Sequence, residues 1–270
     1  MKYPITATLS LPPIEAGESA ASVGALRFLK EQGFDGADLS TYFLDLSDWR
    51  RTYEAVAAAR EEAGLPFLGS HLPFYGAALD RNMYAAIDLC AALKIPVAVI
   101  HPPGLTKPAR GFDVKRECEE AYAYLAPYRD YAQGRGLLLA VENMRLAPSV
   151  RACRRFCQSA EEVLSLAERL DTAVCWDTGH GNSTGCDQEG ELALLGKRLR
   201  WVHINDNTGI DDDHLPPFEG NVDFAAVARG LSKAGYTGAF NYEIAASRVP
   251  ASLRAPLAAY LVAAAKEILK

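Results

Sequence analysis

The chain carries a carboxylate and an imidazole at the end of a short apolar run. Asp177 closes the run that begins at Ala173, a Thr-Gly pair follows, and His180 stands just beyond it. The apolar run is typical of a buried strand, and the Thr-Gly pair is typical of the turn that stops it. There the two side chains can converge on one metal ion or substrate, although a capping aspartate and a structural histidine would have the same spacing.

Similar residues end most of the other apolar runs, of which we find eight and expect each to be a β-strand. The runs are Ile5–Ser10, Gly36–Ser40, Pro66–His71, Val97–His101, Leu137–Asn143, Ala173–Asp177, Trp201–Asn205 and Ala239–Ile244. The polar residues at or just beyond their ends are His71, His101, Glu142, Asp177, His180, His203 and Glu243, and the loop after the seventh run adds Asp212 and His214. All five histidines of the chain belong to this set.

Segments with helical spacing separate the runs. They are Ala20–Gln32, Asp48–Ala63, Asn82–Leu93, Val114–Gln133, Ala160–Leu170, Glu191–Leu199, Phe224–Ala234 and Ala251–Leu269. Apolar strands that alternate with helices indicate a parallel sheet covered by helices. Eight such repeats in 270 residues favour a (β/α)8 TIM barrel over an open doubly wound sheet. No GxGxxG motif opens a helix after the first strand and no linker is visible, so we expect one domain over residues 1–270.

The polar strand ends predict a metal site at the C-terminal face of the barrel, because the loops after parallel strands build the active site there. Buried carboxylates at Glu142, Asp177 and Glu243 would carry large desolvation costs unless cations paired with them. Lysine and arginine are almost absent from these strand ends, so we expect a divalent cation. Carboxylate and imidazole ligands suit Mn²⁺, Co²⁺, Mg²⁺ or Zn²⁺. The additional histidines favour Zn²⁺ or Mn²⁺ and permit more than one ion.

Composition narrows the class of protein. The chain is 49% hydrophobic, with a net charge of −6 and a pI near 5.5, which disfavours nucleic acid and anionic membranes as main partners. No apolar run approaches the roughly 18 residues needed to cross a membrane, and the first residues lack the apolar core of a signal peptide. The six cysteines form no CxxC pair, so we expect reduced thiols and a cytoplasmic protein.

The motifs together resemble the xylose-isomerase-like TIM barrel superfamily, which holds sugar and sugar-phosphate isomerases and epimerases as well as the apurinic endonucleases. The stretches that carry the resemblance are Ser70-His-Leu-Pro73, Ile100-His-Pro102, Val141-Glu-Asn143, Trp176-Asp-Thr-Gly-His180, Val202-His-Ile-Asn205, Asp212-Asp-His214, Glu219-Gly-Asn-Val-Asp-Phe224 and Tyr242-Glu-Ile244. They cover most of the chain in register.

The two branches of that superfamily imply different ion counts. The resemblance to the epimerases implies one metal held by Glu142, Asp177, His203 and Glu243, with the two glutamates as acid and base and His180 at the substrate. We expect His71, His101 and Arg145 to contact substrate as well. In the endonucleases nine ligands hold three zinc ions, and this chain matches all nine positions: the four named above together with His71, His101, His180, Asp212 and His214.

The chain departs from both branches. Ketose epimerases have an arginine a few residues after the seventh-strand histidine, whereas the stretch from His203 to Gly209 has none, which disfavours a free-ketohexose epimerase. Endonucleases grip DNA with basic and aromatic loops, whereas the only dense basic stretch here runs from Arg145 to Arg155. One interpretation of that stretch is a lid whose arginines, among them Arg151, hold a phosphate or carboxylate. The alternatives are a solvated excursion or a subunit interface in a homo-oligomer.

We predict a metal-dependent isomerase or epimerase of a sugar, sugar phosphate or related polyol. A proton would be transferred through a metal-bound enediolate by Glu142 and Glu243. The alternatives are an apurinic-endonuclease-type zinc phosphodiesterase, a metal-dependent lyase or dehydratase on the same barrel, and a binding protein without turnover. The expected partner is a small carbohydrate rather than nucleic acid or a membrane.

Overall fold

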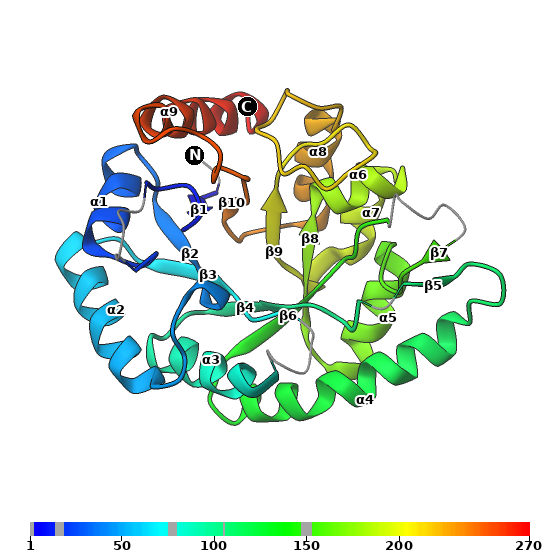
Figure 1. Ribbon diagram of the computed structural model, residues 1–270. Helices are drawn as coiled ribbons and strands as arrows, with labels where there is room; N and C mark the ends of the chain where they lie inside the picture. Colours follow the sequence, from blue (N-terminus) through cyan, green and yellow to red (C-terminus); the bar gives the residue numbers. More distant parts are fainter. Residues whose placement is uncertain (1–2, 14–18, 75–79, 105, 147–152) are drawn as a thin grey trace.

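Eight parallel strands close into a barrel in the order β1-β10-β9-β8-β6-β4-β3-β2 (Figure 1). The computed structural model describes the chain except for residues 1–2, 14–18, 75–79, 105 and 147–152. The barrel strands are β1 (Ile5–Thr8), β2 (Gly36–Ser40), β3 (Phe67–His71), β4 (Val97–Ile100), β6 (Leu138–Glu142), β8 (Ala173–Asp177), β9 (Leu199–Ile204) and β10 (Phe240–Tyr242). The predicted TIM barrel is confirmed, and all eight predicted strands are found within two residues of their expected ends.

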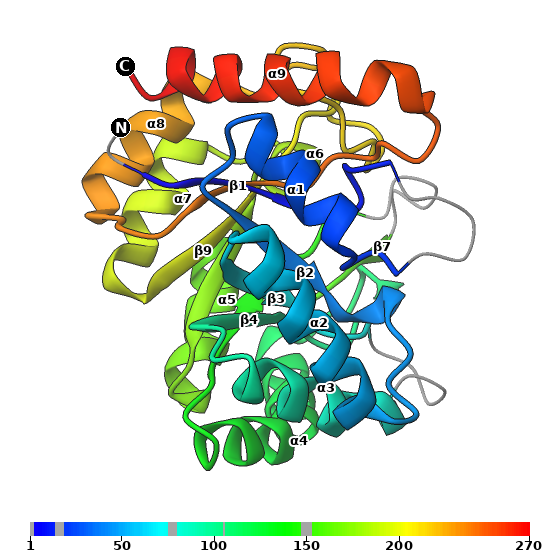
Figure 2. The same cartoon turned by 90° about the vertical axis from the view of Figure 1, so that its left-hand side faces the viewer.

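Helices surround the strands in both views (Figures 1 and 2). They are α1 (Val23–Glu31), α2 (Trp49–Ala63), α3 (Asp80–Ala92), α4 (Val114–Gln133), α5 (Ala160–Leu170), α6 (Thr178–Thr184), α7 (Gln188–Leu195), α8 (Phe224–Ala234) and α9 (Ala251–Ile268), with short 3-10 turns η1 (Thr41–Phe43) and η2 (Gly196–Arg198). Figure 2 shows α9 and α8 side by side on the outside of the barrel.

Two expectations about the helices are wrong. The segment Glu191–Leu199 was expected to be one helix, but α7 begins earlier and ends at Leu195, because Gly196 takes a positive φ of 50° and the chain then turns into β9. The Thr-Gly pair after Asp177 was expected to be a turn, but it opens the short helix α6. The Asp177 carboxylate caps that helix by accepting the His180 N–H at 2.7 Å.

Local signals at other helix ends behave as expected. Gly33, Gly64 and Gly235 follow α1, α2 and α8 with φ of 92°, 63° and 66°, the left-handed region that favours glycine. The Ser159 hydroxyl accepts the Glu162 N–H at 3.3 Å at the start of α5, which is one half of the predicted capping box. The other half is shifted, because the Glu162 carboxylate accepts the N–H of Gln158, one residue earlier.

The barrel interior has an apolar floor below its polar mouth. Val99, Ala140, Cys175 and Trp201 belong to a separate cluster of buried residues inside the strands. The indole of Trp201 lies against Gly69, where a Cβ atom would stand 2.3 Å from Trp201 Cζ2. Residues two apart on a barrel strand face the same side, so Trp201 and His203 of β9 both face the barrel interior. The histidine lies nearer the C-terminal end of the barrel.

All six cysteines are free thiols, and four of them are buried. Within the part of the chain that the structure describes, every helix is too short or too polar to pass through a bilayer.

Candidate metal centre

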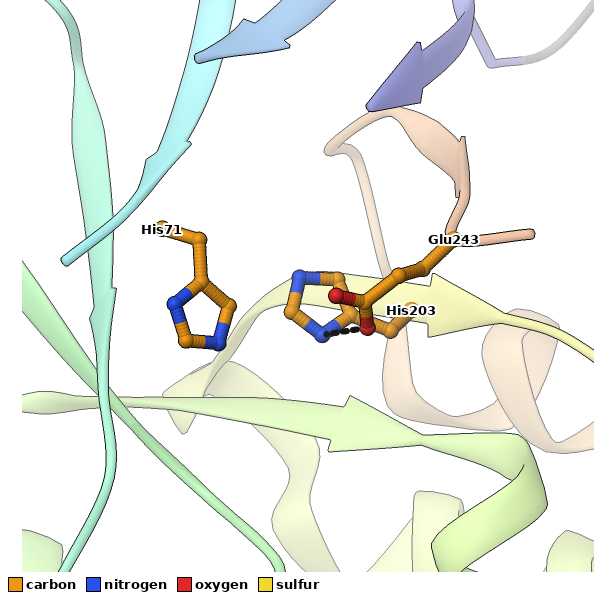
Figure 3. A group of neighbouring side chains, drawn as sticks. All are labelled: His71, His203 and Glu243. Atoms are coloured by element: carbon orange, nitrogen blue, oxygen red, sulfur yellow. Dashed lines mark ion pairs between the residues drawn. The ribbon is translucent and has the colours of Figure 1, made fainter. Parts of the chain in front are cut away.

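The polar strand ends converge at the C-terminal mouth of the barrel. His71, Glu142, Asp177 and His203 lie within the last residues of β3, β6, β8 and β9, and Glu243 directly follows β10. Figure 3 shows His71, His203 and Glu243 reaching from three separate strands toward one another. Because these strands are parallel and closed into a barrel, residues far apart in sequence share one site.

Glu142, Asp177, His203 and Glu243 form the first of three donor groups, which we call the core group. Glu142 Oε1 lies 2.9 Å from His203 Nδ1, and Glu243 Oε2 lies 3.1 Å from the same nitrogen. One donor atom from each of the four residues falls within 4.8 Å of the others. Glu142, Asp177 and His203 are buried and Glu243 is half-buried.

Glu142 also belongs to a second donor group, with His71 and His101. Its Oε2 lies 2.9 Å from His101 Nε2 and 3.3 Å from His71 Nε2. The two carboxylate oxygens of Glu142 therefore face different sets of histidines, so this residue can bridge two adjacent sites.

A third donor group consists of His180, Asp212 and His214. The two oxygens of Asp212 lie 3.5 Å from His180 Nε2 and 3.3 Å from His214 Nε2. His180 links this group to the core, since its Nδ1 lies 3.6 Å from Glu142 Oε1. The structure thus brings all nine predicted ligand residues together, in three adjoining groups that sequence alone did not define.

Backbone contacts orient three of the imidazoles. The Nδ1 atoms of His71, His180 and His214 lie 2.7–2.9 Å from the carbonyl oxygens of Leu72, Asn143 and Glu243. A carbonyl only accepts, so each Nδ1 carries the proton and donates it. In the neutral ring Nε2 is then free to coordinate, which is the usual arrangement of a metal-ligating histidine.

Asp177 is held in place by several polar contacts. Its Oδ1 accepts the His180 N–H, and its Oδ2 accepts from Asn205 Nδ2 at 2.7 Å. The amide of Asn143 pairs with the backbone of Asp177 in both directions, at 2.6 and 3.1 Å. Gly179 is required here, because a Cβ on it would stand 1.9 Å from Asn205 Oδ1. The capping role considered for Asp177 is therefore real, and it leaves the carboxylate facing the core group.

Burial and mutual charge shift the pKa values of the cluster strongly. Burial opposes ionisation of Glu243, but the charge of His203 outweighs it and lowers the Glu243 pKa to about 2. Burial likewise opposes protonation of His180 and His214. The carboxylates of Asp177 and Asp212 outweigh it and raise the pKa of both histidines to about 10. Burial raises the pKa of Asp177. Without a metal, the carboxylates thus favour protonated, positively charged imidazoles beside them, and a bound cation would take over that role.

The donor chemistry fits a divalent cation. Among the described residues, the ion pairs of Glu142 and Glu243 are all with histidines, none with lysine or arginine. The carboxylate oxygens and imidazole nitrogens suit Zn²⁺ and Mn²⁺ and admit Mg²⁺ or Co²⁺. The thiol of Cys175 lies close to Glu142 and His203, but burial raises its pKa, which favours the neutral form.

Sequence reasoning missed Asp38, a buried carboxyl behind the core group. Asp38 Oδ2 lies 3.7 Å from His203 Nε2 and accepts from Asn241 Nδ2 at 3.1 Å. In the described part of the chain, neither His203 Nε2 nor Asp38 Oδ1 has a hydrogen-bond partner. The sequence does contain one indication of this residue: Asp38 is an acidic residue in the middle of the apolar run Gly36–Ser40.

The basic stretch from Arg145 to Arg155 follows β6, and Arg145 lies beside the metal centre. Arg145 Nε lies 3.4 Å from Asp212 Oδ2, beside the third donor group. Arg154, in the two-residue strand β7 (Cys153–Arg154) that pairs with β5 (Lys107–Pro108), forms an ion pair with Glu162. Arg155 Nε donates to Thr106 Oγ1 at 3.1 Å. Arg151 lies outside the described residues, so the predicted lid stays a prediction.

Comparison with known proteins assigns the chain to a family. Residues 26–266 match the model of the xylose isomerase-like TIM barrel family, and the chain belongs to that family. It is 28% identical over 163 residues to an uncharacterized protein of Methanocaldococcus jannaschii, a match that covers 58% of this chain and 54% of the relative. The chain therefore matches about half the length of that relative.

Solved structures show the same fold. A xylose isomerase domain protein from Alicyclobacillus acidocaldarius superposes with a TM-score of 0.76 at 20% identity, covering 98% of both chains. A D-allulose 3-epimerase from Methylomonas sp., in complex with D-allulose, superposes with a TM-score of 0.75 at 17% identity, covering 98% of this chain and 96% of that one. At these identities the likeness concerns the fold alone.

Proposed function

We propose that the chain is a divalent-metal-dependent isomerase or epimerase of a sugar, sugar phosphate or related polyol. One observation carries this proposal: Glu142 and Glu243, on β6 and just after β10, approach the same nitrogen of His203 at 2.9 and 3.1 Å. Two carboxylates that share one site can hold different protonation states. A reaction that removes a proton from one face of a carbon and returns one to the opposite face can use such a pair as base and acid.

The core group would hold the cation. The donor set of Glu142, Asp177, His203 and Glu243 suits Zn²⁺ or Mn²⁺ best, with Mg²⁺ or Co²⁺ as alternatives. When bound, a divalent cation supplies Lewis-acid stabilisation of the negative charge that develops on the substrate oxygens. Asp38 would orient His203 from behind, as a carboxylate commonly does for a ligating imidazole.

The two glutamates would act as acid and base. One removes the proton beside the substrate carbonyl, and the other returns it from the opposite side. Positioned groups of this kind contribute about 10² to 10⁴ in rate. The apolar floor at Trp201 limits water below the site. Phe74, whose ring centroid lies 5.1 and 5.0 Å from those of His71 and His101, offers an apolar face to the carbon skeleton of a sugar.

Several observations support the choice of substrate class. The Methylomonas relative of the fold is a D-allulose 3-epimerase, which favours carbohydrate. The stretch from His203 to Gly209 lacks an arginine, whereas Arg145 stands beside Asp212 at the mouth. We therefore favour a sugar that carries a phosphate or carboxylate over a free ketohexose. His180, His71 and His101 would contact its hydroxyl groups unless they hold further ions.

We also infer the setting of the enzyme. Six free thiols are consistent with a reducing compartment, so we place it in the cytoplasm. A closed barrel cannot be divided without breaking its strand pairing, so residues 1–270 would form one domain.

Proton exchange tests the proposal directly. The protein loaded with Mn²⁺ or Zn²⁺ is incubated in D₂O with ketoses, ketose phosphates and keto-acid sugars, and NMR follows deuterium at the carbon beside the carbonyl. We expect exchange with at least one sugar, lost on chelation and restored by metal. A lyase or dehydratase would instead consume the substrate and form cleavage products or a dehydrated keto product. No exchange with any sugar, despite bound metal, would count against the proposal and favour a binding protein.

A zinc phosphodiesterase of the apurinic endonuclease type is the second candidate. It is favoured by the two additional donor groups and by the position of Glu142 in two of the three. The net charge of −6 counts against it, because DNA affinity depends on neutralised phosphates. Cleavage of a duplex with an abasic site, abolished by a chelator, would establish this activity.

A further inference from the structure

The opposite end of the barrel holds a pocket that the metal centre does not use. The pocket has a volume of about 230 Å³, and its lining residues stand at or just before the beginnings of their strands. Leu68, Val97, Leu138 and Ala239 form apolar walls, and Trp201 and Arg200 are also among the lining residues. An engineered apolar cavity of roughly 150 Å³ accommodates benzene, so this one has room for a substituted ring.

Trp201 lines this pocket, and its indole also carries an unsatisfied donor that is buried away from the pocket. The residue is 2% exposed, and its Nε1 has no acceptor among the residues that the structure describes. Trp176, also fully buried, differs because its Nε1 donates to Gln188 Oε1 at 2.9 Å. Buried donors in native proteins are almost always paired.

A cationic hollow adjoins the apolar pocket. It has a volume of about 300 Å³ and shares Leu138 and Arg200 with the first pocket. Its further lining includes Lys197, Arg198 and Thr172 and one carboxylate, that of Asp171. Thr172 Oγ1 is a second buried polar atom without a partner in the described chain. Arg198 is already engaged, with Asp171 Oδ1 at 3.1 Å and Thr172 O at 2.9 Å.

Lys197 and Arg200 supply the free charge of this hollow. Both are exposed, and neither forms an ion pair with any described residue. Two uncommitted cations beside an apolar pocket are notable in a chain whose net charge is −6. The two hollows meet at Arg200, so an apolar pocket and a positive rim are continuous there.

We propose that the N-terminal end of the barrel binds a small amphipathic anion. An aromatic ring or branched chain would lie against Trp201, Leu68 and Val97. A carboxylate or phosphate group would lie on Arg200 and Lys197. None of these residues belongs to the three donor groups, so this site stands independently of the proposed enzymatic activity.

Indole NMR resonances test the proposal on the intact, metal-loaded protein. The chain has three tryptophans, so the indole signal lost in Trp201→Phe identifies Trp201. If that variant does not fold, Trp49→Phe and Trp176→Phe assign the signal by elimination. Benzoate, phenyl phosphate and neutral benzyl alcohol are the probes. We expect at least one anion to shift the Trp201 signal saturably while the Trp176 signal stays in place, and benzyl alcohol to bind at least about tenfold more weakly.

Charge variants supply the control. Arg200→Gln should weaken binding of the anion about tenfold and leave the metal content unchanged. Arg110→Gln, which removes an exposed arginine elsewhere, should bind as the parent does. A stronger response to benzoate or to phenyl phosphate identifies the preferred head group. The proposal is overturned if no probe moves the Trp201 signal at millimolar concentration, or if Arg200→Gln and Arg110→Gln bind equally.

Discussion

His203 Nδ1 lies 2.9 Å from Glu142 Oε1, although 61 residues separate the two in sequence. Their strands are not neighbours, because β8 stands between β6 and β9, so the contact spans part of the barrel mouth. Glu243 reaches the same nitrogen at 3.1 Å. One ring nitrogen carries at most one proton, so it cannot fully satisfy two buried carboxylates. The arrangement therefore calls for a further positive charge, which supports a cation in the core group.

Neutralising either glutamate should stop turnover. Glu142→Gln and Glu243→Gln each remove an acid–base group, and we expect kcat in the proton-exchange assay to fall by about 10² to 10⁴. Glu61→Gln, at an exposed position on α2, is the matched control and should keep full activity. Full turnover in both site variants would contradict the assigned roles.

Arg145 should affect substrate affinity rather than chemistry. If its guanidinium binds an anionic group of the substrate, Arg145→Gln should raise KM for the charged sugar about tenfold with little change in kcat. Steady-state kinetics on a phosphorylated sugar and on its unphosphorylated counterpart check this. An equal effect on both sugars would show that Arg145 does not recognise the phosphate.

The protein stripped of metal should lose stability as the pH rises. The pKa values of His180 and His214 are raised from 6.5 to about 10 by the surrounding carboxylates. Their protonation therefore stabilises the folded state fully below about pH 6.5, and this contribution is lost as the pH rises through 10. Chemical unfolding in chelator should show a decrease of several kcal/mol between pH 6.5 and pH 9, because each histidine loses about 1.4 kcal/mol per pH unit there.

At acidic pH the stability of the metal-free protein should fall as the pH falls. The Glu243 pKa is lowered from 4.5 to about 2, so its contribution is present above pH 4.5 and is lost as the pH falls toward 2. Stability of the chelated protein should thus be greatest between about pH 4.5 and 6.5. Asp212→Asn removes a carboxylate that raises both histidine pKa values and should flatten the alkaline decrease. An alkaline profile that is flat in the parent protein would show that the histidines are neutral.

Gly69 should be intolerant of a side chain. A Cβ there would stand 2.3 Å from the Trp201 ring, so Gly69→Ala forces repacking of the barrel floor and should cost about 1–3 kcal/mol of unfolding free energy. Gly24→Ala in α1, where the nearest atom is 3.8 Å away, should be neutral or stabilising. Urea unfolding of the two variants checks the difference, and equal stability would show that the floor can relax.

The sequence was sufficient to predict the barrel and the set of polar strand ends. Apolar runs that alternate with helical segments dictate a parallel sheet, and its closure brings the strand ends to one face. The helix α6 was not predictable from local signals, because Gly179 and Gly181 are poor helix formers. Its stability comes from distant contacts, such as the Asn207 amide that donates to the Gly179 carbonyl at 2.8 Å.

The division of the ligands into three groups also required the structure. Glu142 belongs to two groups because its two oxygens face His203 and His101 separately, and no spacing in the sequence reports which oxygen faces which residue. Asp38 escaped notice because its nearness to His203 depends on how β2, β1, β10 and β9 are paired. Contacts of this kind depend on how the strands pair, and a pattern of neighbouring residues in the sequence does not report that pairing.

Metal content tests the central claim most directly. The protein is loaded with Zn²⁺ or Mn²⁺, passed through a desalting column and measured by elemental analysis, beside His203→Ala and Glu61→Gln. We predict at least one tightly held ion per chain in the parent and in Glu61→Gln, and a clear loss in His203→Ala. One ion per chain supports the isomerase, and three favour the phosphodiesterase. The account would be contradicted if the parent protein retained no ion, or if His203→Ala retained as many ions per chain as the parent protein.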